Sequence, residues 1–325
     1  MAYLIGSLML GFMILTSVPT LAGSAPEVKT REIEIAHMFA LDDPHHVAML
    51  SADKFLREKT NGRLGFKIYP NGTYGNQSNS IQAVRMGTLD AFNQGVQPEF
   101  YKPIGALQGP YLFKNYEHFQ KVKKSDYFKK LIGTYEAGMG VKIVGVAHFG
   151  FRHAALRKEA RNAADFKGVK LRVSNFAPYP EAAVILGAIG TPLPIGDVYM
   201  AIKTGVVDGT ENPLPQIYTM KFHEVTSNII LTGHMLSLNT YFVSTKLWNS
   251  LSKEDQNLVV EAHNLITRTV EQANEQQEQE YLNKFKEAGL KIITPDTKSF
   301  VDRLPLVLQK YPEWNDIYKN IRAIE

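Results

Sequence analysis

Two kinds of hydrophobic and polar pattern alternate along the first half of the chain. Residues 32–38, Glu-Ile-Glu-Ile-Ala-His-Met, alternate with period two, which predicts a half-buried strand. A helical segment over 44–59 follows and ends at Asn61-Gly62, a turn signal. This alternation continues and is typical of an α/β fold built from βαβ units with right-handed crossovers. The further predicted segments are strands over 64–69, 89–93 and 142–147 and a helix over 76–86 that ends at Gly87.

A second α/β unit begins near Phe149. Its predicted segments are a strand over 169–173, a helix over 179–186, a turn over 191–194 and a helix over 197–204 closed by Gly205. Later, residues 236–243, Leu-Ser-Leu-Asn-Thr-Tyr-Phe-Val, form a long strand without a turn signal inside it. Because such a strand can run between two domains, we expect one hinge there and the other at 148–152.

A long helix is expected over residues 252–288. Ser252 and Asp255 form a start that resembles a capping box, and neither Pro nor Gly occurs before Gly289. Apolar residues recur at helical spacing through the segment. An unbroken helix of about 36 residues would be ~54 Å long, longer than a small domain is wide. We therefore expect it to lie across both domains, the alternative being a kink in the polar stretch 271–280.

The N-terminus carries an export signal. Residues 4–18 are nearly all apolar, which is too short for a typical membrane span, and small residues follow at Ala22-Gly23-Ser24-Ala25. The pattern predicts a signal peptide over 1–22, cleaved near Ala22. No Lys or Arg precedes the apolar run, so the alternative is an uncleaved N-terminal anchor.

Composition narrows the class of protein. The chain is 44% hydrophobic and 21% charged, as in a soluble globular protein, and the residues after the signal peptide are enough for two domains. It has no cysteine, so a large core and not disulfides must hold an exported form together, and no lipid can be attached to an N-terminal cysteine. If the protein is bacterial, the expected location is therefore the periplasm.

Charge and motif searches exclude several functions. The 36 basic and 32 acidic residues are spread along the chain, which does not predict a nucleic-acid surface. A local basic cluster is interpreted as a solvated helix face. No phosphate-binding glycine loop with a lysine stands out. No motif of a serine nucleophile stands out either. The cluster comprises Lys121, Lys123, Lys124, Lys129 and Lys130.

Histidines near acids or near the expected hinge have two interpretations each. His45 and His46 follow Asp42 and Asp43, but adjacent residues at a helix start do not face one point, so a helix N-terminus with a pocket role is favoured over a metal site. His148 and His153 flank the hinge expected at 148–152. Either histidine could tune ligand protonation, although a structural hydrogen bond is the simpler role.

The candidate site lies in the middle of the chain. Lys-Gly-Val-Lys-Leu-Arg-Val at 167–173 places Arg172 at the end of a buried strand, and Val-Asp-Gly-Thr-Glu-Asn-Pro at 207–213 places Asn212 in a nearby turn. A guanidinium meets a carboxylate with two parallel hydrogen bonds, and an amide can both donate and accept. The pair predicts a site for a small organic anion, unless Arg172 pairs with a protein acid such as Glu211.

These segments resemble the DctP family of extracytoplasmic solute receptors, the substrate-binding proteins of tripartite ATP-independent periplasmic (TRAP) transporters. The similarity rests on KGVKLRV at 167–173, DVYMAIKTGVVDGTENPL at 197–214, MGTLDAFNQG at 86–95 and the long helix. The resemblance implies two α/β lobes that close on a ligand. The expected domains are residues 28–149 with 238–277 and residues 150–237 with 278–325, joined by hinge strands and spanned by the helix 252–288.

The resemblance also implies which residues face the ligand. Arg172 matches the family's carboxylate-binding arginine, and Arg152 matches a second arginine often directed at the ligand. Ile195 stands where several members have an aromatic ring, and Gln77 where some have an acid, so these two positions depart from the family. Tyr241 could reach the site from the hinge strand. The other expected ligand-binding residues are Asn212, Asn93 and Gln94.

The function implied is capture of a small organic acid in a closing interdomain cleft and its delivery to the small and large membrane subunits of a TRAP permease. No catalytic residue, metal or cofactor is expected, and the protein is expected to be a monomer. Two arginines indicate a carboxylate with a second polar or anionic group: a C4-dicarboxylate, sugar acid, keto acid or sulfonate. The alternatives are a ligand sensor for a kinase and a periplasmic enzyme that uses Arg172 as an anion clamp and His153 as a base.

Overall fold

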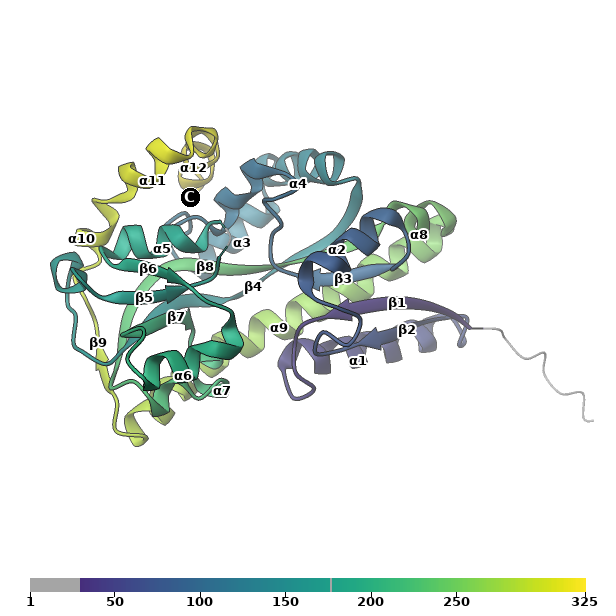
Figure 1. The fold of residues 1–325 in the computed structure, drawn as a ribbon. Helices are drawn as coiled ribbons and strands as arrows, with labels where there is room; N and C mark the ends of the chain where they lie inside the picture. Colours follow the sequence, from purple (N-terminus) through teal and green to yellow (C-terminus); the bar gives the residue numbers. More distant parts are fainter. Residues whose placement is uncertain (1–29, 176) are drawn as a thin grey trace, which may run out of the picture.

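A computed structural model describes residues 30–175 and 177–325, which form a two-lobed α/β fold around one mixed sheet (Figure 1). The signal peptide predicted over 1–22 lies outside the described residues. The sheet order is β2-β1-β3-β8-β4-β7-β5-β6, and β9 also pairs with β8. The strands are β1 (Arg31–His37), β2 (Leu64–Tyr69), β3 (Ala91–Gln94), β4 (Val141–Leu156), β5 (Lys170–Val173), β6 (Ile189–Pro192), β7 (Gly209–Pro213), β8 (Asn228–Ser244) and β9 (Lys291–Ile293).

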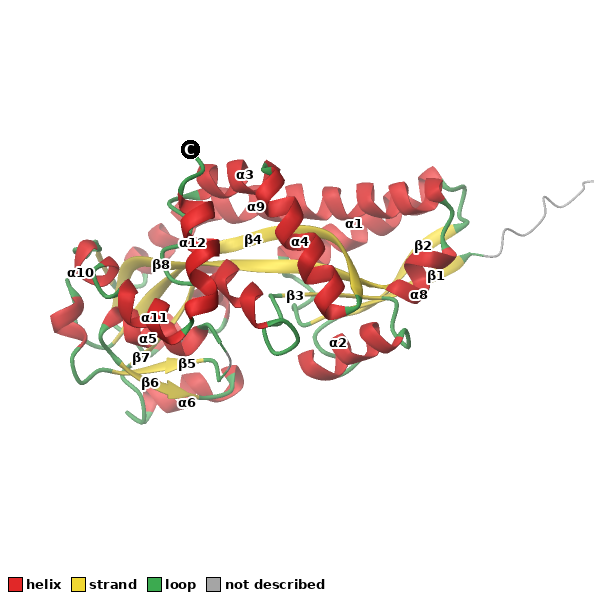
Figure 2. Cartoon of the chain, turned by 90° about the horizontal axis from the view of Figure 1, so that it is seen from above, coloured by secondary structure: helices red, strands yellow, loops and turns green. Residues whose placement is uncertain are grey.

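Helices cover both faces of the sheet in each lobe. Figure 2 shows α1 and the long helix α9 on one face of the first lobe and α2 on the other. The helices are α1 (Pro44–Lys59), α2 (Gln77–Met86), α3 (Tyr116–Lys124), α4 (Asp126–Met139), α5 (Tyr179–Leu186), α6 (Val198–Lys203), α7 (Leu214–Thr219), α8 (Thr245–Ser250), α9 (Lys253–Glu287), α10 (Lys298–Val301), α11 (Leu304–Lys310) and α12 (Asn315–Arg322). Short 3₁₀ helices are η1 (Lys102–Gln108), η2 (Ala163–Phe166), η3 (Ile195–Asp197), η4 (Phe222–Glu224) and η5 (Pro312–Trp314).

The antiparallel strands β4 and β8 run through both lobes. Their 16 and 17 residues pair side by side, with register shifts between His148 and Phe151 and between Arg152 and Ala154. Gly150 and Gly233, with φ of 96° and 52°, supply left-handed backbone at these irregularities, where other residues would be strained. The first irregularity coincides with the hinge expected at 148–152.

The long helix α9 packs against both lobes without interruption. The Ser252 hydroxyl accepts a hydrogen bond from the Asp255 amide at 3.1 Å and caps the helix. Arg63 holds the Asp255 carboxylate through two bonds of 2.6 and 2.8 Å. The helix contacts α1 in the first lobe and α7 and β9 in the second. It is continuous over 253–287, so the kink considered for 271–280 does not occur.

Most predicted segments occur in the structure, with three differences. The predicted turn at 191–194 begins inside β6, which pairs in parallel with β5. The predicted strands at 142–147 and 236–243 are parts of the much longer β4 and β8. The pattern also predicted only βαβ units, whereas β3, β4, β7 and β8 pair antiparallel. The two-lobed α/β class is confirmed.

The C-terminal helices return toward the first lobe. Tyr318 on α12 donates to the Pro110 carbonyl oxygen at 2.8 Å, and His118 Nε2 on α3 lies 3.2 Å from the Ile321 carbonyl oxygen. Residues after α11 therefore pack on η1 and α3, although they were expected in the second domain. The domain boundaries stay a prediction. None of the described helices is long and apolar enough to cross a membrane.

Candidate functional site

Arg172 lies on the short strand β5, which the Val-Asp-Gly turn fixes to β7. The Asp208 carboxylate accepts a hydrogen bond from the Lys170 amide at 2.8 Å. At Gly209 a side chain would collide with the carbonyl oxygen of Ala155, so glycine permits the close approach of β7 and β4. The turn therefore places the next residues of β7 beside Arg172 on one side and beside β4 on the other.

The Arg172 side chain is buried but only partly satisfied. It is 2% exposed, and its Nε and Nη2 donate to the Leu193 carbonyl oxygen at 2.9 and 2.6 Å. Nη1 is buried and has no hydrogen-bond partner among the described residues. Burial lowers the pKa of Arg172 to about 10, which the nearby Glu211 carboxylate only partly offsets. A buried cationic N–H group without a partner is an open position for an anion.

Arg152 has the opposite surroundings, because Glu211 pairs with it fully. Its Nη2 donates to Glu211 Oε1 at 2.9 Å and to the Glu211 carbonyl oxygen at 2.6 Å. Nε donates to the same carboxylate, and Nη1 donates to Ser237 Oγ at 3.2 Å. Glu211 was considered as a partner of Arg172, but its ion pair is with Arg152.

His234 completes this buried ion pair. Its Nε2 lies 3.1 Å from Glu211 Oε2, and its Nδ1 lies 2.8 Å from Thr232 Oγ1. Burial lowers the pKa of His234, so the ring is neutral at pH 7. Burial alone would raise the pKa of Glu211, but Arg152 and His234 outweigh burial and hold that pKa below its ordinary value. Glu211 is therefore ionised and cancels the charge of Arg152.

A tyrosine and a glutamine connect this cluster to the first lobe. The Arg152 guanidinium carbon lies 4.8 Å from the centre of the Tyr179 ring. Gln108 Nε2 donates to the Tyr179 hydroxyl at 3.2 Å, and Gln108 Oε1 accepts from the Leu238 amide on β8 at 2.8 Å. Gly95, the residue after β3, lies beside the Gln108 side chain. The end of β3 is thus linked to the arginine cluster.

The first-lobe residues predicted at the site lie at the ends of β3 and α2. Gln94 pairs with Thr240 across the β3–β8 ladder, and both Gln94 Oε1 and Thr240 Oγ1 are buried with no hydrogen-bond partner within residues 30–175 and 177–325. Asn93 faces α1, where its Nδ2 lies 3.8 Å from Met49 Sδ, and its Oδ1 has no partner in the same ranges. Gln77, the first residue of α2, donates to Gln97 Oε1 at 3.3 Å.

The remaining predicted site residues make contacts within the protein. Asn212 accepts from Thr210 Oγ1 at 2.8 Å and donates to Gln216 Oε1 at 2.7 Å. Ile195 is half-buried in η3, two residues after the Leu193 carbonyl that holds Arg172. Tyr241 is completely buried beneath α9, and its ring centre lies 5.6 Å from that of His263. The structure therefore brings Arg172 and Arg152 together beside Glu211, occupies the Asn212 side chain with Thr210 and Gln216, and places Tyr241 in the first-lobe core.

Two groups of residues at or near the site were not identified from the sequence. Tyr179 and Gln108 were not singled out by any motif. The second group surrounds His45: its ring stacks on Phe39 at 4.0 Å, meets the Phe149 ring at 5.0 Å, and its Nε2 lies 2.6 Å from Asn239 Nδ2.

His45 also helps to begin α1, as the favoured interpretation expected. The Asp43 carboxylate accepts from the His45 amide at 2.8 Å and caps the helix. Across the described chain, no group of three or more histidine, aspartate and glutamate side chains is arranged to hold a metal ion.

Comparison with known proteins identifies the family. Residues 35–313 match the family described as bacterial extracellular solute-binding protein, family 7, known as DctP. The chain belongs to this DctP family. Related DctP proteins include the sialic acid-binding periplasmic protein SiaP of Vibrio cholerae, 28% identical over 82% of this chain and 84% of that protein. Another is the 2,3-diketo-L-gulonate-binding periplasmic protein YiaO of Escherichia coli, 26% identical over 94% of this chain and 95% of the relative.

Solved DctP-type structures share the fold. A TRAP periplasmic solute-binding protein from Haemophilus influenzae with bound L-gulonate is 27% identical, with a TM-score of 0.81 over 89% of this chain and 97% of that chain. One from Roseobacter denitrificans with bound 3-deoxy-D-manno-oct-2-ulosonic acid is 25% identical, with a TM-score of 0.83 over 91% of this chain and 100% of that chain. The protein is thus a solute-binding protein of the TRAP type, and its named relatives are periplasmic binding proteins.

Proposed function

We propose that the protein binds a small organic acid between its lobes through a carboxylate on Arg172 and delivers it to the small and large subunits of a TRAP permease. The observation that carries this proposal is the buried Arg172 Nη1, which has no partner among the described residues. A carboxylate fits this end of the guanidinium, because two parallel charge-assisted hydrogen bonds can form there. Such a ligand would also offset the burial that lowers the pKa of Arg172.

The charge of the cluster supports a ligand with one negative charge. Arg152 and Glu211 cancel each other, and His234 is neutral, which leaves the single charge of Arg172. The second arginine was expected to take a second polar or anionic group of the ligand, but its donors are already used by Glu211 and Ser237. A monocarboxylate therefore fits this cluster better than a C4-dicarboxylate.

Neutral groups near the end of β3 support a ligand with hydroxyl groups. Gln94 Oε1 and Thr240 Oγ1 are buried acceptors without partners, and a hydroxyl donor would satisfy them. Gln77 adds a neutral amide at the start of α2. Among the related structures, bound L-gulonate and 3-deoxy-D-manno-oct-2-ulosonic acid are both acids with several hydroxyl groups. A hydroxylated sugar acid is the ligand class that these observations favour.

An enzymatic role has less support. His153, considered as a base, accepts a hydrogen bond from the Gly233 amide at 3.1 Å through Nδ1, and its Nε2 faces Glu278 of α9 at 3.9 Å. Both ring nitrogens thus face protein groups at the irregular part of β4 and β8. The named relatives are binding proteins. No contact in the structure favours the kinase-sensor alternative.

Thermal-shift screening of organic acids followed by calorimetry tests the proposal. The expected hits are hydroxylated monocarboxylates such as L-gulonate, with succinate binding at least ~10-fold more weakly because its second charge finds no cation. Equal or tighter binding of succinate would overturn the charge argument. Binding of sugars that carry no acid group, with no response to any acid, would overturn the role of Arg172.

A further inference from the structure

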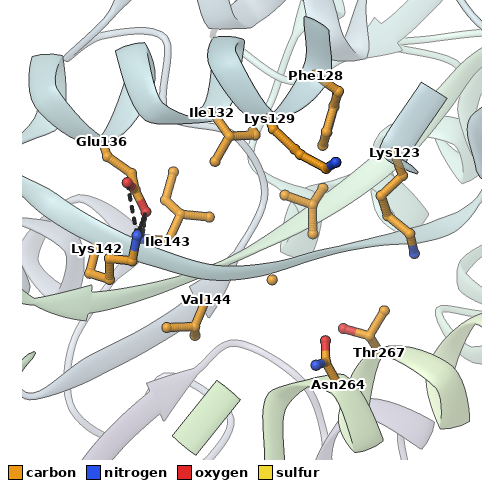
Figure 3. A pocket seen from close by; sticks show the side chains of 12 residues that line it. Lys123, Phe128, Lys129, Ile132, Glu136, Lys142, Ile143, Val144, Asn264 and Thr267 are labelled. Carbon is orange, nitrogen blue, oxygen red and sulfur yellow. Dashed lines mark hydrogen bonds and ion pairs between the residues drawn. The ribbon is translucent and has the colours of Figure 1, made fainter. Parts of the chain in front are cut away.

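A second cavity lies in the first lobe, away from Arg172. It has a volume of about 350 Å³, within the range of small-molecule sites. Figure 3 shows α4 above it, β4 crossing it and α9 below it. None of the residues that contact Arg172 or Arg152 lines this cavity. It is therefore separate from the proposed carboxylate site.

An irregularity in β4 opens the floor of the cavity. Ile143 pairs with Phe242 and Gly145 pairs with Tyr241, so Val144 is an additional residue in the strand. Gly145 has no side chain, and a Cβ atom there would come within 2.8 Å of the Tyr241 ring. Because of this close approach, glycine is required at 145.

The walls of the cavity combine an apolar side with a polar side. Phe128 and Ile132 on α4 face Asn264 and Thr267 on α9 (Figure 3). Thr267 is 6% exposed, and its hydroxyl faces Tyr241, with which it shares a side-chain hydrogen bond. The apolar wall on α4 and the lysine at the rim favour an occupant that is apolar along most of its length and charged at one end.

Three lysines line the rim of the cavity, and each lies beside an acidic side chain. Lys123 is held by Glu271 at 2.8 and 2.9 Å, and Lys142 is held by Glu136 at 2.7 Å. Lys129 differs, because its only ion pair is with Asp126, and both side chains are exposed, at 65% and 99%. Exposed pairs of this kind exchange readily with solvent. Lys129, whose ammonium group lies over the cavity in Figure 3, is thus available to an anion.

We propose that this cavity is a second binding site, for a small amphipathic anion with an apolar body and one carboxylate or sulfonate group. The apolar body packs between Ile132 and the floor of β4. The anionic group pairs with Lys129 at the rim. Such a site gives a function to Lys129 of the basic cluster, which the organic-acid site does not use.

Titration of the folded protein with anilinonaphthalene sulfonate tests this site, because the probe has an apolar body and one sulfonate. We expect saturable binding of one probe molecule, followed by fluorescence, and displacement by octanoate. Lys129→Glu should weaken the binding of the probe at least about tenfold, because it replaces an attractive charge with a repulsive one. Ile132→Trp should abolish probe binding by filling the cavity, and thermal melting confirms that the variant is folded.

Matched variants separate the outcomes. Lys130→Glu makes the same charge change on α4 at an exposed position that does not line the cavity, so it should leave probe affinity within about twofold. Arg172→Met should also leave it unchanged. Absence of saturable binding would overturn the proposal. Equal weakening by Lys130→Glu and Lys129→Glu, or loss of probe binding in Arg172→Met, would do the same, because the probe would then bind by general charge or at the carboxylate site.

Discussion

Arg172 and Arg152 lie on strands on either side of β7, and both are almost completely buried, yet their surroundings differ in one group. Arg152 has a carboxylate within its reach, whereas Arg172 has only a carbonyl oxygen. The difference shows that the residue type does not decide the role of a buried arginine. Arg152, which the protein has paired, is part of the structure, and Arg172, whose Nη1 has no partner among the described residues, is the one for which we propose a ligand.

The largest expected effect is on ligand binding when the unpaired arginine is removed. Arg172→Met should weaken the binding of the acid identified by screening at least ~100-fold, because it removes the charge of the described cluster that no carboxylate balances. Calorimetry measures this loss. Arg161→Gln is the control, since Arg161 is exposed and pairs with Glu159. A change of less than about threefold in Arg172→Met would contradict the assignment of the carboxylate to this residue.

Removal of the paired arginine should instead affect stability. Arg152→Met leaves the Glu211 carboxylate buried without its main partner, which should cost about 3–5 kcal/mol of unfolding free energy. Arg172→Met should cost much less, because no buried acid loses its partner. Denaturant unfolding compares the two variants. The double variant Arg152→Met with Glu211→Leu should recover much of the loss, and the comparison fails if the two single variants are equally unstable.

Acid should act on buried histidines before it acts on the Arg152–Glu211 pair. Burial lowers the pKa of His263 from 6.5 to about 4. As the pH falls from 6.5 to 4, the unfolded chain takes up a proton there and the folded protein does not, so stability falls by about 1.4 kcal/mol per pH unit for this group. Glu211, whose pKa is below its ordinary value of 4.5, contributes stability that is lost only below that pH.

The His263→Leu variant measures the histidine contribution. Between pH 6.5 and 4, its unfolding free energy should depend on pH less steeply than that of the wild type. The difference in slope should correspond to one proton fewer taken up on unfolding. Comparison at pH 8, where neither form is protonated, gives the cost of the substitution itself. Identical slopes in the two proteins would mean that His263 is not the group that titrates on unfolding.

The smallest effect is expected for an exposed ion pair. Lys298 and Asp302 are 2.6 Å apart on the surface, with side chains 77% and 58% exposed. Solvent screens such a pair, so Lys298→Ala should leave the melting temperature unchanged within error. A loss comparable to that of Arg152→Met would show that burial does not separate structural from superficial ion pairs in this protein.

Local patterns predicted the elements that their own residues determine. The helix over 44–59, the strand over 64–69 and the helix over 179–186 have the predicted bounds. Each is bounded by residues with strong local preferences, such as Asp43-Pro44 at the start of α1 and Gly187 after α5. The basic cluster interpreted as a solvated helix face lies on α3 and α4, although the bounds of these helices were not predicted. In contrast, no signal was identified for η1, and the end of the exposed strand β6, Thr191-Pro192, was interpreted as part of a turn.

The sequence directed attention to the residues of the candidate site, but it did not reveal how they pair. The strand with Arg172 and the Asp-Gly turn were evident in the sequence, and the resemblance directed attention to Arg152. Which arginine forms an ion pair with Glu211 depends on the register of β4, β7 and β8, and these strands are distant in the sequence. Tyr241 shows the same limit, because the alternation of a strand does not reveal which face α9 covers. Its role as a ligand contact stays a prediction.

The path of the chain also governs when the protein can fold. The core cluster beneath α1 joins Ile33 and Ile35 on β1 to Tyr241 on β8 and to Ile266 and Val270 on α9. The first lobe therefore cannot complete its core until most of the chain has been synthesised, and its contacts span long separations in sequence, which slows folding.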